Sequence, residues 1–390
     1  MDFLFSFVNF LQPGVLWPEL ASYRPMLIIA LVAGVLGVFR ESKYLRSDAF
    51  GHSTFIFLGL FILAQILSTY YSGIWSMLDE FNYWYIYPLF VAISILLINS
   101  PTALKRYIWG MMVGSMVVVF YGIYAVVAGL PAAVGGRAGA YGMYENHNDY
   151  SFIIVMVLPF IYMYRKISVG GVERLLLTAS MFGCIGGMFF SLSRGGILAL
   201  VLEFGLIITN TVAKERRLGL LFILAIFGAA AIGYQWAMRE ANQGSSYTAD
   251  DAEASRFELW QAGMNMVLDK PLLGVGSRRF GENAANYGEI SHDNLGKVSH
   301  NTYIEVISTS GLLGFIPFVL MLRSMWRALK EPTDSKDFPW IEATGKAALI
   351  ALYVIMFRAL LDAKPHDWSF YLFASIAIAY SGLRQQKASA

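Results

Sequence analysis

The sequence predicts an all-α integral membrane protein with about twelve transmembrane helices and one large, partly helical extramembrane loop. Hydrophobic residues make up 57% of the 390 residues and charged residues only 14%, and the mean hydropathy is +0.54. A soluble domain carries about 25% charged residues, so a soluble protein of this size could not cover its surface with this supply. These observations exclude a soluble enzyme, a disordered scaffold and a secreted module.

Twelve apolar runs give the number of helices, since a membrane-crossing helix needs about 20 mostly apolar residues. The first run is interrupted at Pro13-Gly14, and Met1-Asp2 supplies no basic region before it. We therefore expect a membrane segment there, not a signal peptide. The first, second, sixth and last runs are short or broken. The runs are 3–20, 25–39, 51–69, 83–99, 106–128, 151–164, 175–191, 195–211, 218–236, 302–322, 341–361 and 368–383.

The distribution of Lys and Arg predicts the orientation. With the N-terminus inside, the short inner connections hold 17 basic residues and the short outer ones four, namely Arg24, Arg137, Arg194 and Lys364. This contrast follows the positive-inside rule. It predicts two cytoplasmic termini and an even number of spans.

The chain divides into residues 1–236 with nine spans, an outer loop at 237–301, and residues 302–390 with three spans. Within the loop, 255–268 has a helical pattern that Pro271 and Gly274 end. Large apolar residues recur there at helical spacing, and we expect this stripe to pack against the membrane domain. The stripe consists of Phe257, Trp260, Met264 and Leu268.

Three spans that begin at the predicted outer face are each preceded or opened by a polar cluster. The clusters are Glu145-Asn-His-Asn-Asp-Tyr150, Ser191-Leu-Ser-Arg-Gly-Gly196 and Ser299-His-Asn301. Four of the five histidines, His147, His292, His300 and His366, lie on the same side. Helix N-termini present free N–H groups and positive dipole ends, so this face favours an anion.

Arg194 is the most informative single residue, because an arginine is costly within a bilayer. One interpretation is a guanidinium that snorkels to the interface. The other is an anion clamp, since guanidinium binds phosphate in a bidentate manner and Gly195-Gly196 allows close approach. Arg256 could be a second clamp or a surface charge, and Arg137, in a glycine-rich loop, is similarly ambiguous.

His300 is a candidate general base, because an imidazole titrates near neutral pH; a structural role is the alternative. The histidines show no HExxH spacing, and Cys184 is the only cysteine. We therefore expect no transition-metal site and no other cofactor. The net charge of +2 and the lack of a basic tract argue against a nucleic-acid partner.

Several segments together resemble the O-antigen ligase and polymerase superfamily of bacterial envelope glycosyltransferases. Asn146-His-Asn-Asp149 is similar to the family's Asn-Pro-Asn-like segment, with His147 where many relatives hold proline. Ser193-Arg-Gly-Gly196 matches its Ser-Arg-Gly signature. The loop contributes Arg256-Phe-Glu-Leu-Trp260 and Pro271-Leu-Leu-Gly-Val-Gly276, and its exit resembles the His-Asn…Gly-x-x-Gly signature from His300 to Gly314. The resemblance covers roughly 130–325.

The resemblance implies a multi-pass enzyme of the bacterial inner membrane, with a periplasmic loop between spans nine and ten. The donor would be a glycan on undecaprenyl diphosphate, transferred en bloc without a nucleotide sugar or a metal and with inversion at the anomeric carbon. The acceptor would be a hydroxyl of lipid A-core or of a second lipid-linked glycan, and the active site would face the periplasm.

This reaction and the charged residues of the outer face together give a hypothesis for the active site. Arg194 and Arg256 would stabilise the diphosphate, and His300 would take the acceptor proton or orient the acceptor hydroxyl. These three are the candidate catalytic residues. The candidate substrate-binding residues are Arg137, Asn146, Asn148, Asp149, Ser193, Arg278, Arg279 and Asn301.

Three alternatives remain at this stage. A ligase-type reaction is favoured slightly over a polymerase that joins lipid-linked repeat units, because the motif set carries the ligase name. The short chain argues mildly against a protein-modifying relative.

A transporter for a polyisoprenoid or an anionic solute would suit Glu203 inside the eighth span. Glu203 could equally be a buried carboxylate that is paired with a neighbouring helix. A transporter should also show inverted repeats and a midplane site, whereas the polar residues here gather at one face.

Overall fold

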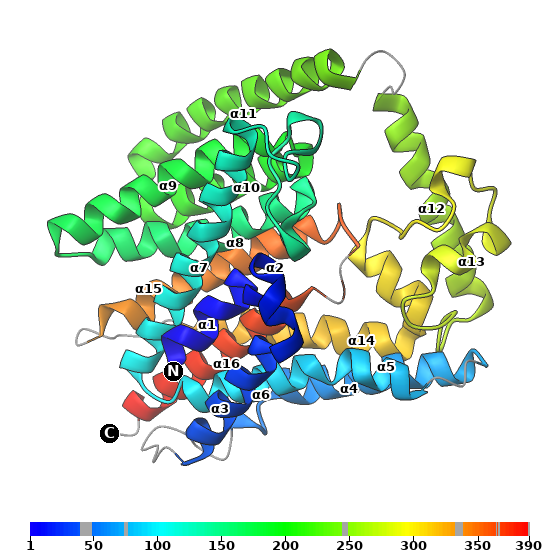
Figure 1. The fold of residues 1–390 in the computed structure, drawn as a ribbon, viewed down its shortest axis with the longest axis horizontal. Coiled ribbons are helices and arrows are strands. Elements are labelled where there is room, and N and C mark those ends of the chain that lie inside the picture. Colours follow the sequence, from blue (N-terminus) through cyan, green and yellow to red (C-terminus); the bar gives the residue numbers. More distant parts are fainter. Residues whose placement is uncertain are drawn as a thin grey trace.

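The computed structural model describes residues 1–39, 49–73, 77–243, 249–331, 338–363, 365 and 367–388. All regular elements within these ranges are helical (Figure 1). The α-helices are α1 Asp2–Leu11, α2 Pro13–Leu16, α3 Pro25–Phe39, α4 Ser53–Tyr71, α5 Met77–Trp84, α6 Ile86–Leu97, α7 Pro101–Val127, α8 His147–Ile167, α9 Gly171–Ser191, α10 Arg194–Thr211, α11 Lys214–Gln243, α12 Ala249–Asp269, α13 Phe280–Tyr287, α14 Thr302–Lys330, α15 Pro339–Arg358 and α16 Trp368–Ala388. The sequence also singled out Arg40, Lys43, Arg46, Lys336, Lys364 and His366, which lie outside the described residues.

Nine helices in the described ranges are long and apolar enough to cross a membrane. They comprise α4, α5 with α6, α7 to α11, α14 and α15, with α11 counted over Lys214–Gln235. The predicted all-helical, multi-pass class is confirmed. The other three predicted spans correspond to the shorter apolar helices α1 and α3 and to α16, and the total of twelve stays a prediction. The sixth run, short by sequence, is a helix of 21 residues in α8.

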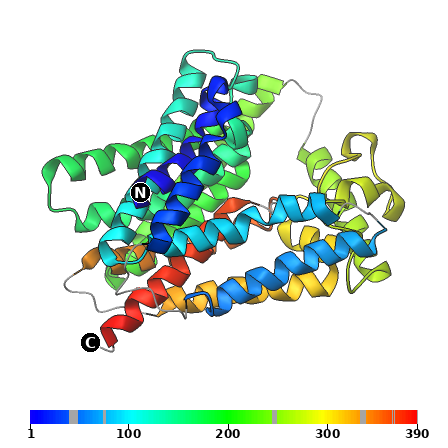
Figure 2. The same ribbon diagram turned by 60° about the horizontal axis from the view of Figure 1, so that its bottom comes forward.

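The core of the bundle is α8, whose residues from Tyr150 to Ile161 are all buried. It packs against α7, α9, α10 and α15. The N-terminal helix α1 lies against α7 at two glycines, Gly110 and Gly114, where a Cβ atom would come within 2.3 Å and 2.8 Å of the Phe3 and Phe7 carbonyl oxygens. By contrast, α11 exposes most of its apolar side chains, as expected for a helix that faces lipid. Figure 2 shows α4 and α14 running side by side below this part of the bundle.

The loop between α11 and α14 contains α12 and α13, which stand to one side of the apolar bundle (Figure 1). The predicted packing face of α12 is wrong. Phe257, Met264 and Leu268 are 68%, 50% and 78% exposed, and the buried residues are Leu259, Ala262 and Met266. These side chains pack with Phe280 and Ala284 of α13.

Small side chains explain why the observed packing face of α12 differs from the predicted one. At Gly263 an added Cβ would lie 2.5 Å from Cγ2 of Ile304 in α14, so α12 approaches its neighbour through its small residues. The sequence prediction had selected the face with the largest apolar residues. Only Trp260 of that face is held inward, where its Nε1 donates to the Ser299 carbonyl oxygen at 2.9 Å.

The same loop is joined to α14 through the backbone. Gly311 interrupts α14 with φ 60° and ψ −165°, a conformation that is essentially restricted to glycine. The N–H groups of Leu312 and Leu313 bond the carbonyls of Pro271 and Leu272, and the carbonyls of Ser308 and Thr309 accept from Val275 and Gly276. Backbone groups released by the break are thereby satisfied within a predicted span.

Candidate functional site

The N-termini of α8 and α10 are joined by a chain of side-chain hydrogen bonds. Asn146 caps α8, and its Oδ1 accepts from the Asn148 N–H at 2.8 Å. The Ser193 hydroxyl donates to Asn148 Oδ1 at 2.8 Å and accepts from the Gly196 N–H at 3.2 Å as the cap of α10. Asp149 lies in the first turn of α8, where its charge complements the helix dipole. Two polar clusters far apart in the sequence thus form one surface.

Arg194 is the first residue of α10 and is half-buried beside this surface. The turn that precedes it is held by Arg137, which is buried. Nε and Nη2 of Arg137 donate to the Ser191 and Leu192 carbonyl oxygens at 3.2 Å and 2.9 Å. Leu192 has a left-handed backbone, with φ 48°. Arg137 therefore fixes the turn from α9 into Arg194, which is a positioning role.

The third cluster, at the start of α14, is anchored on both sides. Asn301 Oδ1 caps α14 by accepting from the N–H groups of Tyr303 and Ile304. The Thr302 N–H donates to the Ala359 carbonyl oxygen at 2.7 Å, and its hydroxyl donates to the Asp362 carbonyl oxygen at 2.6 Å. His300 has φ 52°, so the chain turns sharply there between its two anchored neighbours, Ser299 and Asn301.

Arg358, at the end of α15, connects these clusters and was not among the candidate site residues predicted from the sequence. Its side chain is 2% exposed, and Nη2 lies 3.7 Å from Asp362 Oδ2. The same nitrogen donates to the Asn148 carbonyl oxygen at 3.3 Å. A Cβ added to Gly195 would lie 2.7 Å from its Nη1. An arginine within an apolar run was the available signal.

Arg256 supplies the electrostatic link to the loop. It is half-buried on α12, and its charge acts on His300, on Arg358 and on Asp362. Burial lowers the pKa of the His300 imidazole, and the charges of Arg256 and Lys297 lower it further. Burial raises the pKa of the Asp362 carboxyl, and the Arg358 charge opposes that rise. At neutral pH the His300 imidazole is therefore neutral, and the charges of Arg256 and Lys297 act on it.

The part of the chain that holds much of this geometry is similar to a known protein family. Residues 179–319 match O-antigen ligase. The predicted resemblance to the O-antigen ligase and polymerase superfamily is confirmed, and members of this family are glycosyltransferase-like enzymes. No curated protein matches the chain.

The O-antigen ligase segment extends from α9 into α14 and includes Arg194, Arg256 and His300. From outside this segment, Arg137 bonds the Ser191 and Leu192 carbonyls. Asn148 of α8 accepts from Ser193, and Arg358 of α15 lies against Gly195. The family implies lipid-linked glycan substrates and a membrane location, which agrees with charged groups gathered at the end of an apolar bundle.

Two of the predicted residues are engaged elsewhere. Arg278 lies 3.0 Å from the Glu80 carboxylate of α5, with its guanidinium carbon 3.9 Å from the centre of the Tyr83 ring. Arg279 lies 2.8 Å from Glu282 of α13. These ion pairs hold the two arginines on α5 and α13, and their binding role stays a prediction. Within the described ranges, no group of three or more His, Cys, Asp or Glu side chains could hold a metal ion.

Proposed function

We propose that the protein transfers a glycan en bloc from undecaprenyl diphosphate to a hydroxyl of lipid A-core, at the periplasmic face of the bacterial inner membrane. The observation that carries this proposal is that the charge of Arg256 acts on both His300 and Arg358. Arg358 in turn lies against Gly195, the residue after Arg194, so cations link the neutral imidazole to the start of α10. Such a site suits a reaction that releases an anionic lipid diphosphate while deprotonating a hydroxyl.

In the proposed reaction, the acceptor oxygen attacks the anomeric carbon as the bond from that carbon to the diphosphate oxygen breaks. The electron pair of the breaking bond stays on the diphosphate. Arg194 and Arg256 stabilise the charge that develops there, because preorganised cations act most strongly in a water-poor site. His300 accepts the proton of the acceptor hydroxyl. A single displacement of this kind inverts the anomeric centre and needs no metal.

The remaining polar residues position these groups. Ser193 and Asn148 fix the start of α10 and thereby the direction of Arg194, and Arg137 holds the turn before it. Arg358 contacts the same surface by donating to the Asn148 carbonyl oxygen and by lying against Gly195. Asn146 and Asp149 at the start of α8, and Asn301 next to His300, would bind sugar hydroxyls. Arg278 and Arg279 would meet the glycan farther out on the loop.

The test is reconstitution of the purified protein in liposomes with an undecaprenyl-diphosphate-linked glycan, with and without lipid A-core. We expect glycan on the lipid A-core. Arg194→Lys keeps the charge and loses the bidentate fork, so it should lower the rate by about 10²–10³-fold. Arg327→Lys, on the exposed surface near the other end of α14, is the matched control and should behave like wild type.

Other products of this reconstitution would indicate a function other than ligase. A ladder of longer lipid-linked chains without lipid A-core would identify a polymerase with the same donor chemistry. Wild-type rates for Arg194→Lys would refute the clamp. If no transfer occurs under any condition, and substitutions of Arg194 and His300 have no effect in cells, transport of a polyisoprenoid would replace transfer as the best hypothesis.

A further inference from the structure

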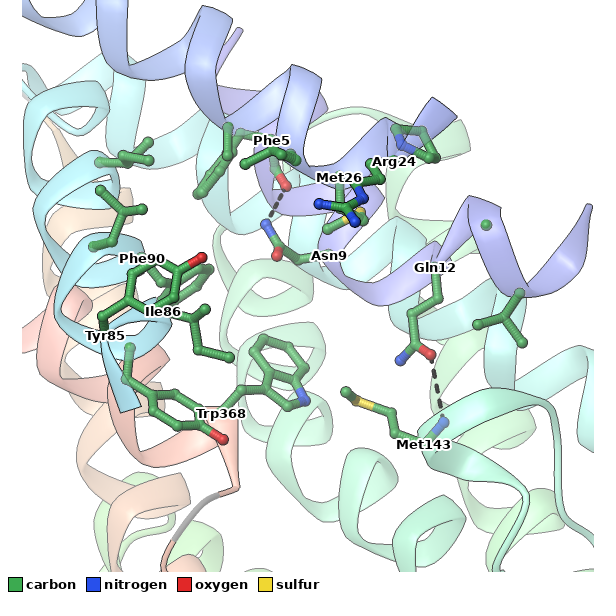
Figure 3. A pocket seen from close by; sticks show the side chains of 18 of the residues that line it. Phe5, Asn9, Gln12, Arg24, Met26, Tyr85, Ile86, Phe90, Met143 and Trp368 are labelled. Carbon is green, nitrogen blue, oxygen red and sulfur yellow. Dashed lines mark hydrogen bonds between the residues drawn. The ribbon is translucent and has the colours of Figure 1, made fainter. Parts of the chain in front are cut away.

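An apolar groove of about 690 Å³ lies between α1, α3 and α6. Its walls include Phe5 of α1, Leu27 and Ala30 of α3, and Phe90 and Ile93 of α6, and Trp368 of α16 closes one end. Figure 3 shows Phe5 and Asn9 facing Ile86 and Phe90 across this space, with Trp368 at its end. Leu27 and Leu89, which also line it, are each 41% exposed. The groove is therefore open to the surroundings of the bundle, which in a membrane are lipid.

Two residues of the groove lining are close in sequence to the candidate site. Met143, in its lining, precedes the Asn146–Asp149 cluster by three residues, and its N–H donates to Gln12 Oε1 at 3.4 Å. Trp368 directly follows Asp367, whose charge acts on Arg358 and Asp362. Chain continuity thus connects the apolar lining to the charged groups from two sides.

The rim of the groove also carries a cation. Arg24 is exposed and lies in the turn between η1 (Pro18–Tyr23) and α3. Its backbone is left-handed, with φ 47°, and its N–H bonds the Ala21 carbonyl oxygen. A cation at the rim of an apolar groove is complementary to a lipid with an anionic headgroup.

We propose that this groove binds the isoprenoid tail of the lipid-linked donor; the proposal rests on the function proposed above. The reacting carbon of the donor is separated from its tail only by the diphosphate, so the tail site must end beside the reacting groups. An acceptor hydroxyl is separated from its own lipid by sugars and imposes no such requirement. The position of the groove therefore favours the donor over the acceptor.

The size of the groove fits part of such a tail. At roughly 30 Å³ for each carbon, the share of volume that one water occupies in the liquid, the groove holds about twenty carbons. A longer isoprenoid would leave through the lipid-facing opening between Leu27 and Leu89. Binding of the first isoprene units beside the diphosphate would set the position of the scissile bond.

Photolabelling tests this directly. The probe is a polyprenyl diphosphate-linked sugar with a diazirine on an isoprene unit near the diphosphate, added to the wild-type protein in liposomes. Mass spectrometry of the labelled peptides should locate the adducts in 5–30 and 85–93. Unlabelled undecaprenyl phosphate should compete, and a phospholipid with palmitoyl chains should not.

A variant that fills the groove adds a kinetic readout. Each buried methylene contributes about fourfold to affinity, so Ala30→Trp should raise the KM for donor by about tenfold or more with little change in kcat. It should also reduce the labelling. The matched control is Ala225→Trp on the exposed face of α11, which should leave both unchanged. The wild-type labelling map remains decisive even if Ala30→Trp fails to fold.

The outcomes separate the two proposals. Transfer activity with adducts outside the groove would refute the groove as the tail-binding site, and the proposed transfer function would still hold. Adducts in the groove without any transfer would support the groove as an isoprenoid site and count against the function. Equal competition by the phospholipid, or no adducts in the groove, would overturn the inference.

Discussion

His300 combines a constrained backbone with an environment that favours the neutral imidazole. Its φ of 52° is rare for a residue with a side chain, and it is held by anchored neighbours at Ser299 and Asn301. Strained backbone often occurs where a side chain must be aimed at a reacting group. At the scale of a residue, therefore, geometry and charge agree on the same candidate base.

The pH dependence of transfer follows from the lowered pKa of His300. In the proposed reaction the neutral form of His300 is the base, so activity should be retained on mild acidification and fall when the pH passes below the lowered pKa. Lys297→Gln removes one charge that lowers this pKa. The pKa should then rise toward its ordinary value, and the acidic limb of the kcat/KM profile should move to higher pH.

Two controls accompany this measurement. His300→Ala should lose about 10²–10⁴-fold in rate, the usual contribution of a general base. Lys270→Gln, at the end of α12, removes a charge that does not act on His300 in this structure, and its profile should match wild type. An unchanged acidic limb in Lys297→Gln would count against His300 as the base.

The pair Arg358–Asp362 gives a second prediction at this scale. Arg358→Met leaves the Asp362 carboxyl largely buried without its cation, which should destabilise the protein by about 3–5 kcal/mol. Adding Asp362→Asn should restore most of the midpoint of thermal unfolding. The rate should stay low in the double variant, because the support of Asn148 and Gly195 is still missing.

This double-mutant comparison separates positioning from stability. The informative readout is kcat against the KM for donor, measured after both variants are shown to be folded. A double variant with full stability and wild-type kcat would show that Arg358 serves the fold alone. Asp362→Asn by itself is the reference for any effect of the carboxyl.

Residue types in a motif could be predicted from the sequence, but residue contacts could not. Arg194 was identifiable because an arginine is costly at the edge of an apolar run, His300 because an imidazole can carry a proton, and Arg256 through its loop motif. Arg358 carries the signal of an arginine within an apolar run, but the sequence gives no indication that the end of α15 lies against Asn148 and Gly195. Arg278 shows the converse: an arginine near the motifs pairs with Glu80 on a distant helix.

At the scale of elements, the junction between α14 and the loop determines where His300 stands. Gly311→Ala would place a Cβ atom 2.3 Å from the Leu272 backbone and force an unfavourable φ of 60°. We expect a loss of about 1–3 kcal/mol from the backbone strain alone and a large loss of transfer activity. Gly382→Ala, where a Cβ atom meets nothing within 4 Å, is the matched control.

Limited proteolysis would show whether the predicted damage is local. Cleavage of the 271–276 segment should become faster in Gly311→Ala, while α8 and α15 stay protected. Proteolysis identical to wild type, together with full activity, would mean that the junction is dispensable.

Helix existence was predictable at this scale, and helix faces were less so. Apolar runs marked the long spans, because length and hydropathy alone define a membrane helix. The buried face of α12 was mispredicted, because Phe257 and Leu268 are larger than Ala262 and Gly263 but do not make the close contact. A helix face that packs through Ala and Gly is not marked by large apolar residues, so it is hard to recognise in a sequence.

For the whole molecule, the positive-inside prediction can be tested by labelling cysteines from one side of the membrane. In a Cys184→Ala background, Val169→Cys and Leu295→Cys give single thiols at exposed loop positions, 99% and 50% exposed. A membrane-impermeant maleimide applied to the periplasmic side should label residue 295 and not 169. Labelling of both positions from the same side would contradict the predicted orientation.

The number of spans is the least predictable property at this scale. Nine helices in the described ranges satisfy length and hydropathy, whereas α1 and α3 are short and belong to the groove wall. Their lengths are 10 and 15 residues, which alone would not cross a bilayer of about 30 Å. In the proposed lipid site, these two short helices would form the wall.

The four backbone hydrogen bonds between 271–276 and the break in α14 also have a mechanical consequence. A segment tied to a membrane helix through its main chain cannot swing outward as a hinged flap unless half of that helix moves with it. We therefore expect this border of the candidate site to stay rigid while the proposed glycan substrate moves past it. Its height would then limit the bulk of the sugar branches next to the transferred linkage, whatever the length of the chain beyond.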